Sequence, residues 1–287
     1  MSSNNFIQKA FEITKENIIL AQPLVIFMIV LSFTLAGLAM QANRAAYIVF
    51  AVSNVLLCTA FFAGWFYMVK QGIYLGKRID NGEYKAPEDR AAASLALGKE
   101  FFPGVGEYFL PMTLTIAIYT AAYIALTFGA LKLGMQILPH INIDLKELMA
   151  AANSTPVQMQ KYVLGLGYEQ LKAINIWMLY LGGILTLFTF FTMFLFPAVY
   201  DDNAEKRELF LLAPFKALWR NLRFIFKNFF GSLGIIVFLF FLNTVLSLLS
   251  VVFNLNIILA IVGLIISFYF MTYAIVLIFL YYEDRKN

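Results

Sequence analysis

The sequence contains little charge, and it has only one cysteine and one histidine. Asp, Glu, Lys and Arg make up 13% of the 287 residues, about half of the fraction found in ordinary soluble domains. Because Cys58 is alone, an internal disulfide framework and a cysteine-based metal site are excluded. His140 alone leaves too few nitrogen ligands for zinc. We therefore expect no metal and no other cofactor.

Motifs for catalysis are missing as well. A Ser-His-Asp arrangement can be drawn only from Ser154, His140 and Asp144, and no nucleophile-elbow motif supports it. The stretch GVGE at 104–107 has the glycines of a phosphate-binding loop but no following Lys-Ser or Lys-Thr. These observations favour a protein that is not an enzyme.

Hydrophobic residues are abundant instead, at 61% of the chain, which is more than one soluble core can bury. Six runs are long enough for a helix to cross a hydrocarbon layer of about 30 Å. They contain no Asp, Glu, Lys, Arg or His, and they do not alternate as barrel strands do. The runs lie at about 18–40, 46–69, 108–130, 174–200, 229–253 and 257–282. We therefore predict an all-α integral membrane protein with a single polytopic domain over 1–287.

The distribution of basic residues predicts the orientation. With the N-terminus in the cytoplasm, 16 of the 21 Lys and Arg residues lie on the cytoplasmic side, as the positive-inside rule requires. Short turns at 41–45 and 254–256 join the first pair and the last pair of spans. The six spans are therefore expected to form three hairpins, with both termini in the cytoplasm. We expect the cytoplasmic (inner) membrane of a prokaryote.

Two long connections carry signals of their own. In the inner loop 70–107, Asn81-Gly82 predicts a turn, Pro87 predicts a helix start, and PGVG at 103–106 is expected to break that helix before the third span. In the outer helical segment 131–173, two short amphipathic helices are expected to begin near Asp144 and Thr155. This segment is interpreted as a lid or as a packing cap.

A basic amphipathic helix is predicted at 213–228, within FKALWRNLRFIFKNFFG. Its four basic residues fall within an arc of about 60°, with apolar residues opposite; they are Lys216, Arg220, Arg223 and Lys227. Such a helix lies in the membrane interface with its charges toward the headgroups. The N-terminal segment repeats the pattern more weakly with Lys9 and Lys15, and 91–102 is a third candidate. Each hairpin is thus expected to follow an amphipathic interfacial helix.

This arrangement resembles a known type of membrane region. An interfacial helix that ends in Lys227-Asn228 with aromatic residues and leads into a span resembles the membrane region of some glycerophosphodiester phosphodiesterases and of related, uncharacterised six-span prokaryotic families. The sequence GIYLGKRIDNGEYKAPE is similar to the inner loop of one such family at Gly72, Tyr74, Arg78, 82–83 and 87–88. The resemblance implies a six-span fold and brings no catalytic residue with it.

A few uncharged positions inside the spans can serve packing or transport. Asn54 and Asn243 lie near the middle of their spans and are expected to bond a neighbouring helix or to line a path for a solute. Small residues recur every four positions in the third span and allow close approach of a helix of this chain or of a second copy; they are Ala117, Ala121, Ala125 and Gly129.

Three functional hypotheses follow. The first is a non-enzymatic membrane module, a scaffold or accessory subunit whose basic inner side binds anionic lipid headgroups or a membrane-protein partner; nucleic acid is not expected, because the basic residues are scattered beside the spans. The second is a transporter of a small molecule or lipid that lacks ionisable groups in its spans. The third is a membrane enzyme acting on lipid headgroups, which would need carboxylates such as Glu107, Asp201 and Asp202 to meet at the inner side.

Overall fold

The structure is a computed structural model, which describes residues 3–40, 43–140, 158, 162, 165–201, 212–253 and 255–286. Over these ranges the regular structure is helical, with no strand. The chain divides into two compact units. Unit 1 comprises Met1–Ile118 and Phe190–Asn287, and unit 2 comprises Tyr119–Thr189.

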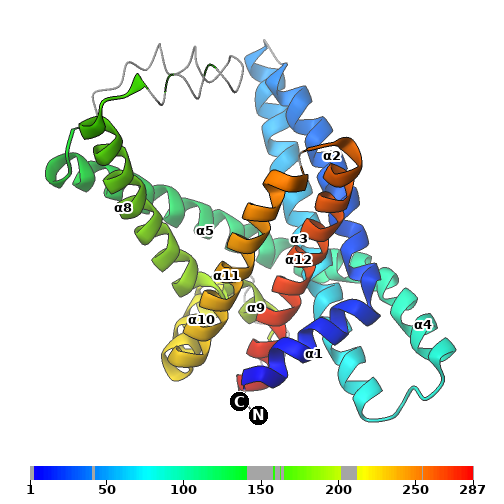
Figure 1. Cartoon of the computed structure of the whole chain (residues 1–287). Helices are drawn as coiled ribbons and strands as arrows, with labels where there is room; N and C mark the ends of the chain where they lie inside the picture. Colours follow the sequence, from blue (N-terminus) through cyan, green and yellow to red (C-terminus); the bar gives the residue numbers. More distant parts are fainter. Residues whose placement is uncertain are drawn as a thin grey trace. The chain divides into compact units, whose positions relative to one another are not determined.

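Figure 1 shows the helices in their order along the chain. Their bounds are α1 Ser3–Glu16, η1 Ile18–Ala21, α2 Gln22–Ala39, α3 Arg44–Asp80, α4 Pro87–Ala96, η2 Leu97–Glu100, α5 Phe101–Ile137, α8 Tyr168–Thr192, α9 Leu195–Val199, α10 Ala213–Lys227, α11 Phe229–Phe253 and α12 Ile257–Arg285. Among the described residues, six helical stretches are long and apolar enough to cross a membrane. The predicted all-helical protein with six candidate membrane spans is therefore confirmed.

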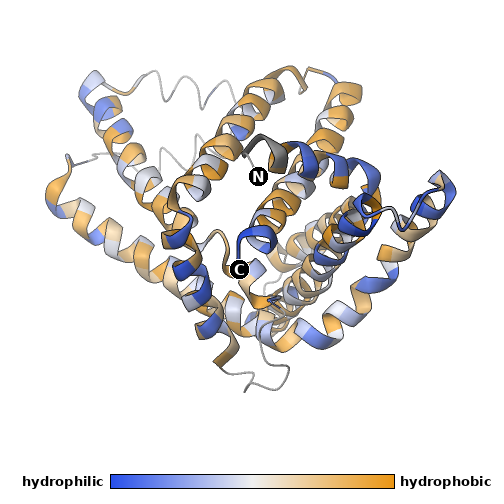
Figure 2. Cartoon of the chain, turned by 90° about the horizontal axis from the view of Figure 1, so that it is seen from below, coloured by the Kyte–Doolittle hydropathy of each residue, from blue (hydrophilic) through white to orange (hydrophobic). Residues whose placement is uncertain are grey.

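The apolar stretches turn most of their side chains outward. Only 6% of the most apolar window of α11 is buried, and the most buried window, in α12, reaches 28%. Hydrophobic residues cover most of the length of the long helices (Figure 2). Soluble monomers rarely expose contiguous apolar surface of this kind. The exposed apolar side chains are those expected of helices in contact with lipid.

Helix α3 runs antiparallel to the segment before it but parallel to α12, since Phe66 meets Phe279 and Tyr74 meets Glu283. The rings of Phe27 on α2 and Phe61 on α3 stack at 3.9 Å, and the Trp65 indole of α3 donates to the Leu20 carbonyl of η1 at 2.7 Å, so η1 and α2 run antiparallel to α3. The amphipathic helix α1 packs beside the C-terminal half of α12, where Phe6 meets Tyr281 edge to face at 5.5 Å (Figure 1). Helix α1 is thus anchored to the C-terminal part of α12.

Unit 2 consists of the C-terminal part of α5 and most of α8. The Tyr180 hydroxyl donates to the Ala130 carbonyl at 3.1 Å, and the Trp177 indole donates to the Pro139 carbonyl at 2.9 Å. A contact between the rings of Tyr119 and Phe188 at 5.2 Å lies further along both helices. Because residues later in α5 meet residues earlier in α8, these two helices also run antiparallel.

The inner loop is more helical than the sequence predicts. Gly82 forms the predicted turn with φ +80, and α4 begins at Pro87 as predicted. However, α3 continues to Asp80, so 70–80 is not a loop. The expected break at PGVG is also wrong, because 103–106 lies inside α5. A glycine is needed at Gly104 for a packing reason: a Cβ there would lie 2.5 Å from Cβ of Tyr67 on α3.

The fourth apolar stretch is interrupted near its end. Helix α8 stops at Thr192 and α9 starts at Leu195, so the helix is interrupted at 193–194, three to four residues before Pro197. Proline has no backbone N–H and crowds the carbonyl four residues earlier, which explains the interruption. The two short outer helices expected near Asp144 and Thr155 lie outside the described residues.

Candidate functional site

Helix α10 presents three different faces, and it begins and ends where the sequence predicts. One face is buried and contains Ala217, Asn221 and Phe224. A second face is apolar and exposed, with Phe215, Trp219 and Phe226 each more than half exposed. The third face is the basic row, the four residues Lys216, Arg220, Arg223 and Lys227, and it adjoins the apolar exposed face. The helix is thus held to the bundle while it offers adjacent apolar and basic surfaces.

Arg220 differs from the rest of the basic row because it reaches a buried acid. Its guanidinium lies 3.9 Å from the carboxylate of Asp201, directly after α9, and donates to the Ala198 carbonyl at 3.3 Å. Asp201 also accepts hydrogen bonds from Lys286 at 3.1 Å and from the Tyr282 hydroxyl at 3.4 Å. Asp201 therefore joins the end of α9 to α10 and to the end of α12.

A second buried acid completes this cluster. Glu283 accepts a hydrogen bond from Lys286 at 3.0 Å and one from the Tyr74 hydroxyl of α3 at 3.5 Å. We call Asp201, Arg220, Glu283 and Lys286 the buried ion cluster; it pairs two acids with two bases. A buried carboxylate is costly unless it is paired and hydrogen-bonded. The arrangement is that of an ionic lock between four helical segments.

The charge of Lys286 is favoured inside this cluster. Burial lowers the pKa of the Lys286 ammonium, but hydrogen bonding and Coulombic attraction to Glu283 and Asp201 outweigh burial, so its pKa is raised above 10.5. The protonated ammonium is therefore the form that holds both acids. A group of this kind is a structural cation rather than a proton donor near neutral pH.

Lys70 is another buried cation, and it contacts the residue next to Asp201 of the buried ion cluster. Its side chain is 2% exposed and donates to the backbone carbonyl of Tyr200, the residue before Asp201. Tyr200 is itself buried, and its hydroxyl donates to the Ala63 carbonyl at 2.8 Å. Through these contacts α3 is tied to the end of α9.

The N-terminal basic residues occupy two environments. Lys9 forms an ion pair with Asp80 at the end of α3, at 2.5 Å, with the two side chains 24% and 55% exposed. Lys15 is exposed. Of the six residues predicted to contact anionic lipid or a partner, Lys15, Arg223 and Lys227 are exposed, whereas Lys9 and Arg220 engage acids of the chain itself.

The uncharged positions inside the spans have different surroundings. Asn54 is buried; its amide donates to the Phe50 carbonyl at 2.9 Å, and its oxygen accepts from Thr34 of α2 at 2.6 Å. Two roles were predicted for Asn54, and the hydrogen bond to a neighbouring helix is present. Asn243 is exposed on α11. The row Ala117, Ala121, Ala125 and Gly129 is exposed along α5.

The carboxylates required by the enzymatic hypothesis have different surroundings. Glu107 is exposed on α5, Asp201 is committed to the buried ion cluster, and Asp202 lies outside the described residues. His140 is exposed, while Ser154 and Asp144 are not among the described residues. Within the part of the chain that the structure describes, no group of three or more His, Cys, Asp or Glu side chains is placed to hold a metal ion.

Sequence reasoning missed Lys70, Glu283 and Lys286, because each follows the end of a predicted span; Lys70 and Lys286 were counted only as basic residues of the inner side, and Glu283 was not considered. A signal did exist for Lys70. The residues after it, Gly72, Ile73 and Gly76, continue an apolar helical stripe. No comparable signal paired Asp201 with Lys286, since they lie 85 residues apart.

Comparisons of the chain with protein-family models, with curated proteins and with solved structures found no match in any of the three. The resemblance to the membrane region of glycerophosphodiester phosphodiesterases therefore stays a prediction.

Proposed function

We propose that this multi-pass protein is a non-enzymatic module of a prokaryotic cytoplasmic membrane, whose basic end binds anionic phospholipid headgroups. In this proposal the antiparallel helix pairs form three hairpins, each following an amphipathic interfacial helix, and both termini face the cytoplasm. The observation that carries it is the three-faced helix α10. An exposed apolar face beside a basic row is the surface that an anionic membrane interface attracts.

The mechanism follows from how α10 is held. Its buried face packs on the bundle and Arg220 locks to Asp201, so the helix is ordered before any lipid arrives. Trp219 and Phe226 can then enter the acyl boundary, while Lys216, Arg223 and Lys227 meet phosphates. Because the helix is already fixed, little conformational entropy is lost when headgroups bind. The commitment of Asp201 to the ion cluster and of Asn54 to Thr34 supports this function over headgroup chemistry or transport.

The test compares two triple variants in the full chain. The first variant removes three of the four charges of the basic row, through Lys216→Gln, Arg223→Gln and Lys227→Gln. It keeps Arg220, so the buried ion cluster stays intact. The control, Arg44→Gln, Lys132→Gln and Lys172→Gln, removes three exposed charges from the predicted outer side. Each basic residue near an anionic leaflet contributes about 1 kcal/mol, so the first variant should retain anionic lipid roughly 100-fold less tightly.

The measurement is lipid mass spectrometry after purification from native membranes, together with labelling of single cysteines for topology. Equal retention of anionic lipid by both variants contradicts the proposal. Co-purification of a stoichiometric acidic membrane protein in place of lipid would also overturn it and would favour the partner-binding hypothesis. An inverted topology would remove the basic row from the cytoplasmic leaflet.

A further inference from the structure

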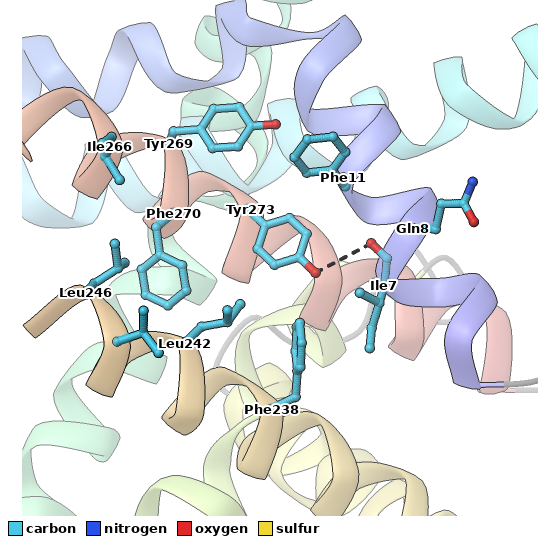
Figure 3. Close-up of a pocket in the computed structure, with 11 residues that line it drawn as sticks. Ile7, Gln8, Phe11, Phe238, Leu242, Leu246, Ile266, Tyr269, Phe270 and Tyr273 are labelled. Carbon is cyan, nitrogen blue, oxygen red and sulfur yellow. Dashed lines mark hydrogen bonds between the residues drawn. The ribbon is translucent and has the colours of Figure 1, made fainter. Parts of the chain in front are cut away.

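Two cavities follow each other along the same three helices of unit 1. The first, of about 570 Å³, lies between α1, α11 and α12 (Figure 3). The second, of about 540 Å³, lies between the same helices and the C-terminal end of α10. Ile7 of α1 lines both, and Tyr273 of α12 donates to the Ile7 carbonyl at 3.4 Å, drawn as the dashed line in Figure 3. Helix α1 therefore lies as a strap over one elongated cleft.

The chemistry of the cleft changes along its length. In the first cavity, Phe238 and Leu242 of α11 and Phe270 of α12 point inward in Figure 3, and the lining is mostly apolar. In the second cavity, Lys227 and Arg285 stand at the rim. None of the described residues that line this second cavity is acidic. The cleft thus has a cationic end and an apolar end.

The cleft is at least as long as one leaflet. Arg285 and Ile266, which line its opposite ends, are 19 residues apart on α12, which corresponds to about 28 Å along the helix axis. The headgroup layer and half of the hydrocarbon core together measure roughly 20–22 Å. The cleft is therefore long enough for a membrane lipid to extend from its cationic part into its apolar part.

Glycine keeps the cationic part of the cleft open. A Cβ placed on Gly234, which lines the second cavity, would have no atom within 4 Å. On the same helix, a Cβ on Gly231 would lie 2.0 Å from the hydroxyl of Tyr281. A larger side chain at Gly234 would accordingly fill the cavity without striking a neighbour at its Cβ, whereas Gly231 is required for packing.

We infer that the cleft beneath α1 holds a single anionic glycerophospholipid, with its phosphate between Lys227 and Arg285 and one acyl chain in the apolar cavity. This inference rests on the proposed function, since it places one tightly held lipid within the basic end that attracts headgroups. Charge complementarity identifies the anionic lipid, because a zwitterionic headgroup would bring its own cation to the two basic side chains. The strap α1 would slow the exchange of this lipid with the bilayer.

The experiment is native mass spectrometry of the full chain released from nanodiscs that contain equal amounts of phosphatidylglycerol and phosphatidylcholine. The wild-type protein should retain one phosphatidylglycerol per chain. Gly234→Phe should abolish retention by filling the cavity, and Lys227→Gln with Arg285→Gln should weaken it roughly 30-fold. Gly183→Phe is the matched control, because Gly183 is exposed on α8 and a Cβ there also meets open space. Size-exclusion profiles verify that each variant is folded.

The outcomes separate the site from the broader function. If Gly234→Phe and the charge variant keep the single lipid as the control does, the cleft is not the site of that lipid and the inference is overturned. This holds even if the lipid around the protein stays enriched in phosphatidylglycerol. If the wild-type protein retains phosphatidylcholine equally well, the anionic identity is wrong. If the wild-type protein shows no enrichment of anionic lipid at all, the proposed function fails and the inference fails with it.

Discussion

The side-chain amide of Asn221 on α10 replaces the hydrogen bonds that are lost where the fourth apolar stretch breaks. Its oxygen accepts from the Phe194 backbone N–H at 3.0 Å, and its nitrogen donates to the Phe191 carbonyl at 2.6 Å. Asn221 is fully buried. Because backbone groups away from water must find partners, the break before Pro197 and the amide on α10 depend on each other.

We expect Asn221→Leu to destabilise the protein and to separate α10 from the break. The substitution leaves one buried N–H and one buried carbonyl unpaired, at a cost of about 1–3 kcal/mol for each group. Asn243→Leu is the control, because the same change is made at an exposed position. Thermal unfolding in detergent checks the effect; equal melting temperatures for the two variants would show that the amide does not maintain the break.

Asp201→Asn should weaken the contact between α9, α10 and α12. Removing the carboxylate leaves Arg220 and Lys286 without their shared acid, and breaking a buried ion pair costs about 3–5 kcal/mol. Asp80→Asn serves as the control. It breaks the ion pair with Lys9, whose acid is 55% exposed, so we expect a loss of at most about 1 kcal/mol. Chemical denaturation that finds the two losses equal would contradict the ionic lock.

The buried ion cluster predicts a dependence of stability on alkaline pH. The pKa of Lys286 is raised above its ordinary value of 10.5 by Glu283 and Asp201, despite burial. A raised pKa means that the stabilisation is fully present below pH 10.5 and is lost as pH rises through the folded-state pKa. The difference in melting temperature between wild type and Lys286→Gln should therefore be constant from pH 7 to pH 10 and shrink above pH 10.5. A difference that grows with pH would reverse the sign and refute this assignment.

The sequence predicts the spans because lipid imposes a simple rule on them. A run without charge that is about 20 residues long must form a helix, and the runs that end at Phe253 and begin at Ile257 agree with α11 and α12. The start of α4 at Pro87 could also be predicted from the sequence, since a proline followed by two acids is typical of the first turn of a helix.

The candidate site could be predicted only in part. The spacing of Lys216, Arg220, Arg223 and Lys227 shows that they share one face, but it does not show that Arg220 reaches Asp201. Likewise, hydropathy places Lys70 outside a span, although α3 continues past it and buries it. Contacts between distant segments decide which charges are solvated, and periodicity along one helix carries no information about them.

The crossing of α3 and α5 yields the most closely matched pair of variants. A Cβ on Gly104 would lie 2.5 Å from Cβ of Tyr67 and 3.1 Å from the Ala63 carbonyl, whereas a Cβ on Gly106 would meet open space. Both glycines lie in α5, so Gly104→Ala and Gly106→Ala change helix propensity alike. Only Gly104→Ala forces the two backbones apart, and overpacking of this kind typically costs about 1–3 kcal/mol.

Thermal unfolding in detergent should therefore show a loss for Gly104→Ala and none for Gly106→Ala. Combining Gly104→Ala with Tyr67→Ala does not rescue the loss, because the shortest contact is with Cβ of Tyr67, which alanine retains. Tyr67→Gly does remove that atom. The double variant Gly104→Ala with Tyr67→Gly should therefore lose less stability than the sum of the losses of the two single variants. Strict additivity of Gly104→Ala and Tyr67→Gly in this double-mutant cycle would show that the two helices do not meet at these residues.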